Sequence, residues 1–271
     1  MPIKLLASDL DGTLVSDLRH IPPRTQAAIQ AAVKRGVQVT LATGREWGVT
    51  QEFMQMLGLN TPVICYQGAL IYDPQTAKTI ARQGLSLPLT RQLIDLARDH
   101  QLSLHLFLNG SVYTEFPTAL SRSILGYIGS NIIEVDDLHQ VIAAAPIKAM
   151  IVHAPTEVEA LVGRLQDMLG KNSSVFRSLD PLIEVTSPQV SKGRALTTLA
   201  EYYGIPQSEV MAIGDQDNDI DMIEWAGLGV AMGNGSPGAK AAADVVAPPL
   251  SEEGAAWAIE QFILQTDGTV L

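Results

Sequence analysis

Apolar residues at both ends of the chain follow two alternating patterns, one of short buried strands and one of helices. Each strand candidate is a short run that is apolar almost throughout, and each helix candidate carries apolar residues at helical spacing. In chain order the first elements are a strand at 3–8, a helix from Pro23 that stops at Gly36, a strand at 37–42, a helix at 46–57 and a strand at 62–65. Strands that alternate with helices predict a parallel sheet covered on both faces.

The pattern changes in the middle of the chain. From about Gly84 to Pro188, strand pairs such as 102–108 and 111–115 stand beside helices at 89–100 and 157–169. After Lys192 the alternation returns, with helices at 193–203 and 218–225 and strands at 210–213 and 229–231. We therefore predict a doubly wound α/β core of residues 1–83 and 188–271 and an inserted α+β domain of residues 84–187. We expect the tail at 265–271 to fray.

The charge balance narrows the range of partners. The chain of 271 residues has a formal net charge of −11, which argues against a general affinity for nucleic acid or anionic membranes. No apolar run approaches the ~18–20 residues of a membrane span, and Asp9 comes too early for a signal peptide. We expect a cytoplasmic protein. If its substrate is an anion, the site needs local positive charge from a metal, a lysine or helix N-termini.

Cysteine and histidine offer little chemistry here. The single cysteine, Cys65, lies in an apolar run and is expected to be buried in a strand; it can form no internal disulfide. The five histidines lie outside every motif, and we expect them on the surface or in the inserted domain.

Two aspartates follow the first strand, in Asp9-Leu10-Asp11-Gly12-Thr13. Residues two apart on an extended strand point the same way, so Asp9 and Asp11 can face one site at the carboxyl edge of the sheet, where such sheets bind ligands. Two close carboxylates need a cation, and Mg²⁺ prefers carboxylate and carbonyl oxygens. An Asp-Gly turn is the alternative. We favour a Mg²⁺ site because the pentapeptide directly follows a buried strand.

A second acidic cluster, Gly214-Asp215-Gln216-Asp217-Asn218-Asp219, follows the strand at 210–213. Asp215 ends that strand and is aimed at the same edge as Asp9. Helix capping would explain one of these acids, because carboxylates suit a helix N-terminus. Capping does not explain so many acids and amides around one strand end, with Asp221 close behind. The cluster therefore favours metal binding.

Two weaker signals suggest an anion site. Thr43-Gly44-Arg45 ends the second strand, where a hydroxyl and backbone N–H groups can hold an anion, although a simple turn would look alike. Lys192 begins a helix, a position that the helix dipole disfavours. Taken alone, Lys192 is better explained as a solvated surface lysine, and a nearby anion is the alternative explanation.

Together the four motifs resemble those of the haloacid dehalogenase-like superfamily. They are Asp-x-Asp-Gly-Thr, Thr-Gly-Arg, Ser-Lys-Gly and Gly-Asp-x-x-Asn-Asp, in that order along the chain. The insert between the second and third motifs is similar to that of the Cof-type branch of sugar-phosphatase-like hydrolases. The resemblance implies a superfamily core with a mobile α/β cap. It also implies a Mg²⁺-dependent phosphatase that acts on a small phosphorylated metabolite.

The resemblance also implies catalytic and metal-binding roles. Asp9 resembles the nucleophile that becomes an aspartyl-phosphate and binds the metal. Asp11 resembles the general acid and then the general base, and its backbone carbonyl resembles a ligand of Mg²⁺. Asp215 resembles the remaining carboxylate ligand, and Asp219 a supporting acid near the metal.

The groups that hold the phosphoryl oxygens follow from the same resemblance. They correspond to Thr43, Gly44 and Lys192, helped by the backbone of Leu10. Asn218 resembles a polar contact that positions Lys192 or the phosphate.

One departure and several alternatives remain. Many relatives carry Asn-Gly-Ala after the third strand, where this chain has Gln67-Gly68-Ala69, so Gln67 is left without a role. A phosphomutase is the nearest alternative, although mutases usually carry their cap between the first two motifs. A haloacid dehalogenase would lack the counterpart of Asp11, and a catalytically silent phosphate-binding regulatory module would be expected to lack Asp9 or Asp11. The substrate and the oligomeric state stay open.

Overall fold

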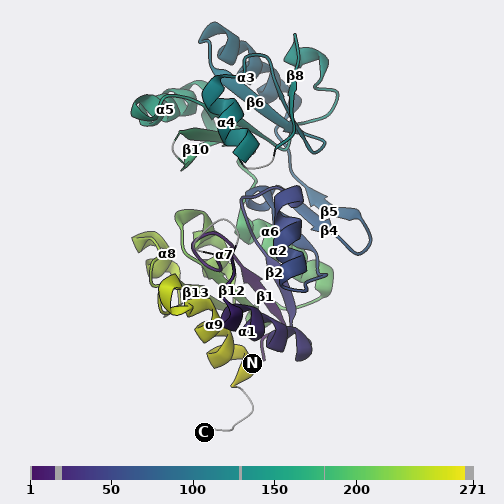
Figure 1. Cartoon of the computed structure of the whole chain (residues 1–271), viewed down its shortest axis with the longest axis vertical. Helices are drawn as coiled ribbons and strands as arrows, with labels where there is room; N and C mark the ends of the chain where they lie inside the picture. The colour runs from purple at the N-terminus through teal and green to yellow at the C-terminus, as the bar shows by residue number, and fades with distance from the viewer. Residues whose placement is uncertain (1, 16–19, 128–129, 180, 266–271) are drawn as a thin grey trace. The chain divides into compact units, whose positions relative to one another are not determined.

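The computed structural model describes residues 2–15, 20–127, 130–179 and 181–265. The chain divides into two compact units, one of residues 1–81 and 191–271 and the other of residues 82–190 (Figure 1). The expected boundaries of the insert, 84 and 187, lie just inside those of the second unit. The expectation of a frayed tail covers 265–271, of which all but Gln265 lies outside the described residues.

The first unit, called the core unit below, is built on a parallel sheet. Its strands, in their order across the sheet, are β14 (Val245–Val246), β13 (Leu228–Ala231), β12 (Val210–Gly214), β1 (Leu5–Ser8) and β2 (Gln38–Leu41). Every pairing in this order is parallel, and β1 is buried along its whole length. The prediction of a doubly wound parallel sheet is confirmed.

A small second sheet continues from the edge of the first. β3 (Val63–Cys65) lies beside the end of β2 through a parallel bridge between Ala42 and Ile64. It pairs antiparallel with β4 (Leu70–Asp73), which is followed by β5 (Lys78–Arg82). Cys65 is fully buried in β3, as predicted.

Helices cover the parallel sheet. They are α1 (Pro23–Lys34), α2 (Trp47–Met56), α6 (Lys192–Tyr203), α7 (Ile220–Trp225), α8 (Pro237–Ala242) and α9 (Gly254–Ile259). Leu196 and Leu199 of α6 pack on Leu5 and Val210 of the sheet, while α1 and α9 pack against each other (Figure 1). α1, α2 and α6 begin and end close to their predicted bounds, and a 3₁₀ turn replaces the first turn expected of α7. The sequence patterns did not predict α8 and α9.

The second unit, called the insert below, has its own sheet and core. Its strands, in their order across the sheet, are β10 (Ser174–Leu179), β11 (Leu182–Thr186), β9 (Lys148–Val152), β6 (Ser103–Leu108), β7 (Ser111–Thr114) and β8 (Ile132–Glu134). Helices α3 (Leu87–Asp99) and α5 (Val158–Leu169) pack on one face of this sheet, and α4 (Ala119–Tyr127) completes the unit. Within the described residues, no helix is long and apolar enough to cross a membrane.

Candidate active site

The carboxyl ends of three neighbouring strands bring the first site residues together. Asp9 follows β1, and its N–H donates to the carbonyl of Ile213 in β12 at 2.9 Å. Thr43 lies just beyond β2 and Asp215 just beyond β12, the two strands that flank β1. Asp9, Thr43 and Asp215 are all buried. The parallel sheet therefore places them at one edge, as the sequence predicted.

A tight turn after Asp9 depends on Gly12. Its φ is +81°, in the left-handed region, and its N–H donates to the carbonyl of Val15 at 3.0 Å. A Cβ on Gly12 would lie 2.3 Å from Oδ2 of Asp215. Glycine is thus required both by the backbone conformation and by the close approach of Asp215.

Asp11 lies in this turn and not in the strand. β1 ends at Ser8, so the argument from strand alternation does not extend to Asp11. Its half-exposed carboxylate instead accepts two hydrogen bonds from Arg45, at 2.9 Å from Nε and 2.5 Å from a terminal guanidinium nitrogen. The carboxylates of Asp9 and Asp11 therefore have different partners.

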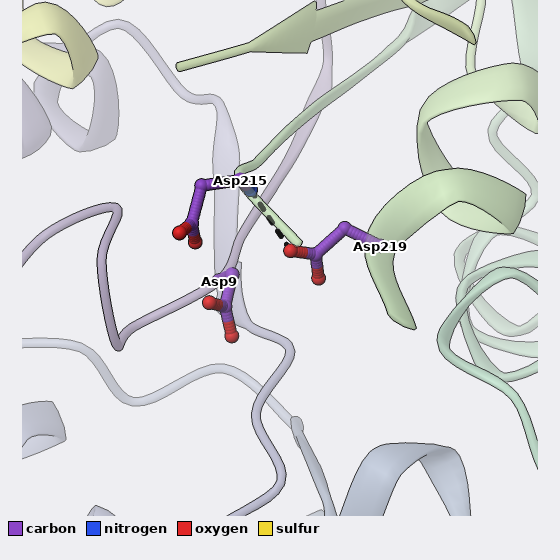
Figure 2. A group of neighbouring side chains, drawn as sticks. All are labelled: Asp9, Asp215 and Asp219. Atoms are coloured by element: carbon purple, nitrogen blue, oxygen red, sulfur yellow. Dashed lines mark hydrogen bonds between the residues drawn. The ribbon is translucent and has the colours of Figure 1, made fainter. Parts of the chain in front are cut away.

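Asp9, Asp215 and Asp219 form a buried carboxylate group, called the acid group below. One oxygen of each lies within 4.8 Å of the others, and Figure 2 shows the three side chains converging from two segments of the chain. Asp215 accepts hydrogen bonds from the Thr13 hydroxyl at 3.0 Å and from the side-chain amide of Gln216 at 2.9 Å. These bonds fix its orientation toward Asp9.

Both carboxylate oxygens of Asp219 accept hydrogen bonds within the site. One of its oxygens accepts the backbone N–H groups of Asp215 and Gln216, at 2.9 and 3.0 Å; Figure 2 marks the first bond with a dashed line. Its other oxygen accepts from Lys192 at 2.6 Å. Because both oxygens are engaged, Asp219 fits a supporting role better than that of a metal ligand.

Lys192 is buried within the acid group. Its ammonium lies 2.6 Å from Asp9 and 2.6 Å from Asp219, and its side chain is 1% exposed. It opens α6, where Ser191 caps the helix by accepting the N–H of Arg194 at 3.3 Å. The interpretation of Lys192 as a solvated surface lysine, favoured for this residue taken alone, is therefore wrong. The anion that offsets the unfavourable helix dipole is protein carboxylate.

Burial and charge shift the pKa of Asp9, Asp215 and Lys192. Burial raises the pKa of Asp9 well above its ordinary value, and the nearby Lys192 opposes that shift. Burial also raises the pKa of Asp215. Burial alone would lower the pKa of Lys192, but the charges of Asp219 and Asp9 reverse this and raise it. The carboxylates are thus short of positive charge, whereas the ammonium is held firmly protonated.

The donor set of the acid group fits a hard divalent cation. Three carboxylates share one ammonium, which leaves two negative charges in a buried place. Oxygen-only ligands suit Mg²⁺, which is commonly bound by one or two protein carboxylates. Asp9 and Asp215 could hold such a cation, since Asp219 is occupied by its own hydrogen bonds.

The remaining acids of the second cluster have structural partners. Asp217 accepts from the Ser236 hydroxyl at 2.5 Å. Asp221 accepts the backbone N–H of Gly193 at 3.1 Å and so ties α7 to the start of α6. The sequence signal for metal binding was strong here because Asp215 stands close in sequence to three acids that have partners of their own, Asp217, Asp219 and Asp221.

Thr43 and Gly44 border the same edge of the sheet. Thr43 is fully buried, and its hydroxyl accepts the N–H of Arg45 at 3.1 Å. A Cβ on Gly44 would lie 2.4 Å from the side-chain nitrogen of Gln67. Asn218, expected beside Lys192 or the phosphate, donates to the side-chain oxygen of Gln67 at 2.8 Å.

Gln67 is the residue that the sequence reasoning left without a role. It follows β3, and it lies against Gly44 while holding Asn218. Tyr66, Gln67 and Gly68 all have positive φ, of 52°, 59° and 99°, a backbone conformation that is costly for side chains other than glycine. The position of Gln67 shortly after a buried strand was the sequence feature that could have identified it as a site residue. Arg45 and Thr13 were also given no role, although they belong to the motifs Thr43-Gly44-Arg45 and Asp9-Leu10-Asp11-Gly12-Thr13.

Comparison with known proteins identifies the family. A family model described as haloacid dehalogenase-like hydrolase matches residues 6–259. The chain belongs to the haloacid dehalogenase-like hydrolases. The resemblance inferred from the four motifs is thereby confirmed.

The relatives of this hydrolase include phosphatases over nearly its whole length. The 5-amino-6-(5-phospho-D-ribitylamino)uracil phosphatase YitU of Bacillus subtilis (strain 168) is 30% identical over 265 residues, which cover 95% of this chain and 97% of that protein. The pyridoxal phosphate phosphatase YbhA of Escherichia coli (strain K12) is 28% identical over 254 residues, covering 91% and 93%. These relatives identify the chain as a hydrolase of the phosphatase kind.

A solved structure of similar fold supports the same family. A haloacid dehalogenase-like hydrolase from Bacteroides thetaiotaomicron is 28% identical and aligns with a TM-score of 0.86 over 96% of this chain and 99% of that chain. The α/β core and the inserted α+β unit of this hydrolase thus have a close structural counterpart.

Proposed function

We propose that this hydrolase is a Mg²⁺-dependent phosphatase that cleaves a small phosphorylated metabolite through an aspartyl-phosphate intermediate. One observation carries the proposal: Asp9 is buried just beyond the carboxyl end of β1, 2.6 Å from the ammonium of Lys192 and within the acid group. A carboxylate placed among cations can approach a phosphate dianion that would otherwise repel it.

In this mechanism Asp9 attacks phosphorus and the ester P–O bond breaks. Asp11 gives its proton to the departing oxygen, then takes a proton from the water that attacks the aspartyl-phosphate and frees Asp9. Lys192 offsets negative charge on the phosphoryl oxygens, while Asp219 holds Lys192 in place. Mg²⁺, bound by Asp9, Asp215 and the carbonyl of Asp11, would supply the remaining neutralisation.

Further groups at the sheet edge would hold the phosphoryl oxygens. The hydroxyl of Thr43 and the backbone N–H groups of Gly44 and Leu10 provide donors beside Asp9. The amide pair of Asn218 and Gln67 lies against Gly44. Dense donors at one place favour a phosphoryl group over a neutral ligand.

We further propose that the insert is a cap that determines specificity. It has a separate hydrophobic core and interrupts the core unit between Thr43 and Lys192 in sequence. The two phosphatases above are named for different compounds, a phosphorylated ribitylaminouracil and pyridoxal phosphate. What these compounds share is a phosphate ester on a small metabolite, and we assign that class to this enzyme.

The test measures phosphate release and enzyme labelling with a panel of ³²P-labelled phosphorylated metabolites. EDTA should abolish release, Mg²⁺ should restore it, and Ca²⁺ should not, because its larger coordination shell can engage both oxygens of the nucleophile. Acid quenching should trap label on the wild type. Asp9→Asn should prevent labelling and lower turnover more than about a thousandfold.

The control is Asp73→Asn, since Asp73 is a buried aspartate of the core unit whose hydrogen bonds, among the described residues, come from Gln75 and Thr76 in the turn after β4. It should label and turn over like the wild type. Full activity without metal, or label on the Asp9→Asn variant, would refute the mechanism. Transfer of label to a second metabolite without phosphate release would identify a phosphomutase, and binding without labelling a regulatory module.

A further inference from the structure

Arg45 and Asp11 form the most complete ion pair at the edge of the active site. Two guanidinium nitrogens donate to the two carboxylate oxygens, at 2.9 and 2.5 Å. The Arg45 side chain is 13% exposed, whereas that of Asp11 is 50% exposed. A planar fork of this kind fixes direction as well as distance, which a single charge contact does not.

The arginine is the better anchored of the two partners. Its N–H donates to the Thr43 hydroxyl at 3.1 Å, and its carbonyl accepts the N–H of Tyr66 at 3.0 Å. Its guanidinium lies 4.8 Å from the ring centre of Phe53, a buried residue of α2. Asp11, by contrast, lies in the turn after β1. The geometry therefore lets Arg45 set the position of Asp11.

We propose that Arg45 is a positioning residue that holds Asp11 for proton transfer, which rests on the proposed role of Asp11 in the phosphatase mechanism. When the ester P–O bond breaks, the proton of Asp11 passes to the departing oxygen and Asp11 becomes a carboxylate. The guanidinium binds that carboxylate with two hydrogen bonds, and the same carboxylate then accepts the proton of the attacking water. The contact strengthens as charge develops, so it favours the transition state.

A direct role for Arg45 in phosphate binding is the competing assignment. The Nε–H and terminal N–H groups of Arg45 that could bind a phosphate in a bidentate way already donate to the carboxylate of Asp11. The two assignments differ in what they affect. A positioning residue affects reactions that need a proton on the leaving group, whereas a phosphate ligand affects every substrate equally.

The experiment compares kcat/KM for a series of aryl phosphates, from dinitrophenyl phosphate to phenyl phosphate, with Mg²⁺ and the full-length chain. The value of kcat/KM reports steps up to phosphoryl transfer, and good leaving groups depart without a proton. Arg45→Gln should lower kcat/KM for phenyl phosphate at least about tenfold more than for dinitrophenyl phosphate. Arg45→Lys should recover part of the loss, because it keeps the charge but not the fork.

The matched control is Arg24→Gln, which breaks a two-bond pair with Glu260 in the same unit, at 3.0 and 2.6 Å. It should leave the leaving-group dependence unchanged, and melting curves should show all variants folded. A uniform loss across the series with weaker inhibition by inorganic phosphate, or no loss at all, would overturn the proposal. If Asp11→Asn also leaves the series unchanged, the failure lies in the proposed role of Asp11 and not in Arg45 alone.

Discussion

Single residues of the site act through close contacts, and Gly12 is the clearest case. Its φ of +81° is a backbone conformation that favours glycine. In addition, a Cβ at this position would lie only 2.3 Å from Oδ2 of Asp215. We predict that Gly12→Ala displaces Asp215, raises the Mg²⁺ concentration needed for activity and lowers kcat/KM more than about tenfold. Activity titrated with Mg²⁺ measures both effects.

Gly36 provides the matched control. It has nearly the same φ, +83°, but no described atom lies within 4 Å of a Cβ placed there. Gly36→Ala should therefore cost only the backbone strain, about 1–2 kcal/mol of stability in a thermal melt. It should leave the Mg²⁺ requirement alone. Equal metal requirements in the two variants would show that Gly12 matters for conformation only.

At this scale the sequence predicted Asp9, Asp215 and Lys192 because strand ends and motif spacing are local properties. It did not predict the partners of Asp11 or Asn218. Asp11 pairs with Arg45, which is 34 positions away in the sequence, and Asn218 bonds Gln67, which is 151 positions away. The left-handed backbone at Gln67 is a further feature that sequence patterns do not reveal.

Among the elements, β6 of the insert carries an unusual buried histidine. His105 is fully buried, and among the described residues neither ring nitrogen has a hydrogen-bond partner of normal geometry. Burial lowers the pKa of His105 to about 4, although the nearby backbones of Ser103 and Met150 oppose the shift. The same sheet face carries the buried Lys148–Glu184 ion pair, at 3.0 Å. The folded insert thus holds a neutral imidazole.

We predict that, because of His105, the stability of the folded protein decreases as the pH is lowered through the mildly acidic range. The unfolded chain binds a proton at an ordinary histidine pKa near 6.5, whereas the folded chain resists it until about pH 4. Between these values the unfolded state binds more protons, so stability decreases as pH falls, by up to about 1.4 kcal/mol per pH unit. His105→Leu should remove that slope in denaturant melts at pH 4.5 to 7.

The comparison with His105→Leu uses an exposed histidine of the same unit. His100→Leu should retain the slope of the wild type, because His100 is exposed at the end of α3. The difference between variant and wild type is the relevant quantity, since Asp9 titrates in the opposite sense. A slope that survives in His105→Leu would assign the acid sensitivity to other groups.

The helices and strands also show which elements the sequence patterns predict and which they do not. The alternating core strands and the amphipathic helices α3 and α5 were predicted within a few residues, because each has a clear period. β4 and β5 were not predicted, since they form a partly exposed sheet whose pairing depends on contacts with β3. The strands β9 to β11 were missed for a similar reason: their order in the sheet, β10-β11-β9-β6, joins distant parts of the chain.

For the whole molecule, the division into two units suggests separate tasks. A net charge of −11 offers no general attraction to an anionic substrate, so positive charge has to be local, at Lys192 and the proposed metal. Every proposed catalytic residue belongs to the core unit. This division agrees with the proposal that the insert recognises the part of the substrate that does not react.

This division predicts the effect of removing the insert. The apolar cluster of the core unit that includes β1, β12 and α6 contains no residue of 84–187, so replacing that segment with a short linker leaves the cluster intact. The shortened chain should retain some Mg²⁺-dependent hydrolysis of p-nitrophenyl phosphate. It should lose discrimination among metabolite phosphates, because contacts to the non-reacting part of a substrate raise its rate above that of a minimal one.

Two controls make the removal of the insert decisive. The shortened chain carrying Asp9→Asn should be inactive, which assigns the residual hydrolysis to this site and not to a contaminant. Stabilisation by Mg²⁺ in a thermal melt should show that the shortened chain has folded and kept its acid group. A closing cap would exclude water and add contacts that a bare site lacks. If the folded, shortened chain ranked its substrates as the full chain does, specificity would have to reside in the core unit, and the role proposed for the insert would be wrong.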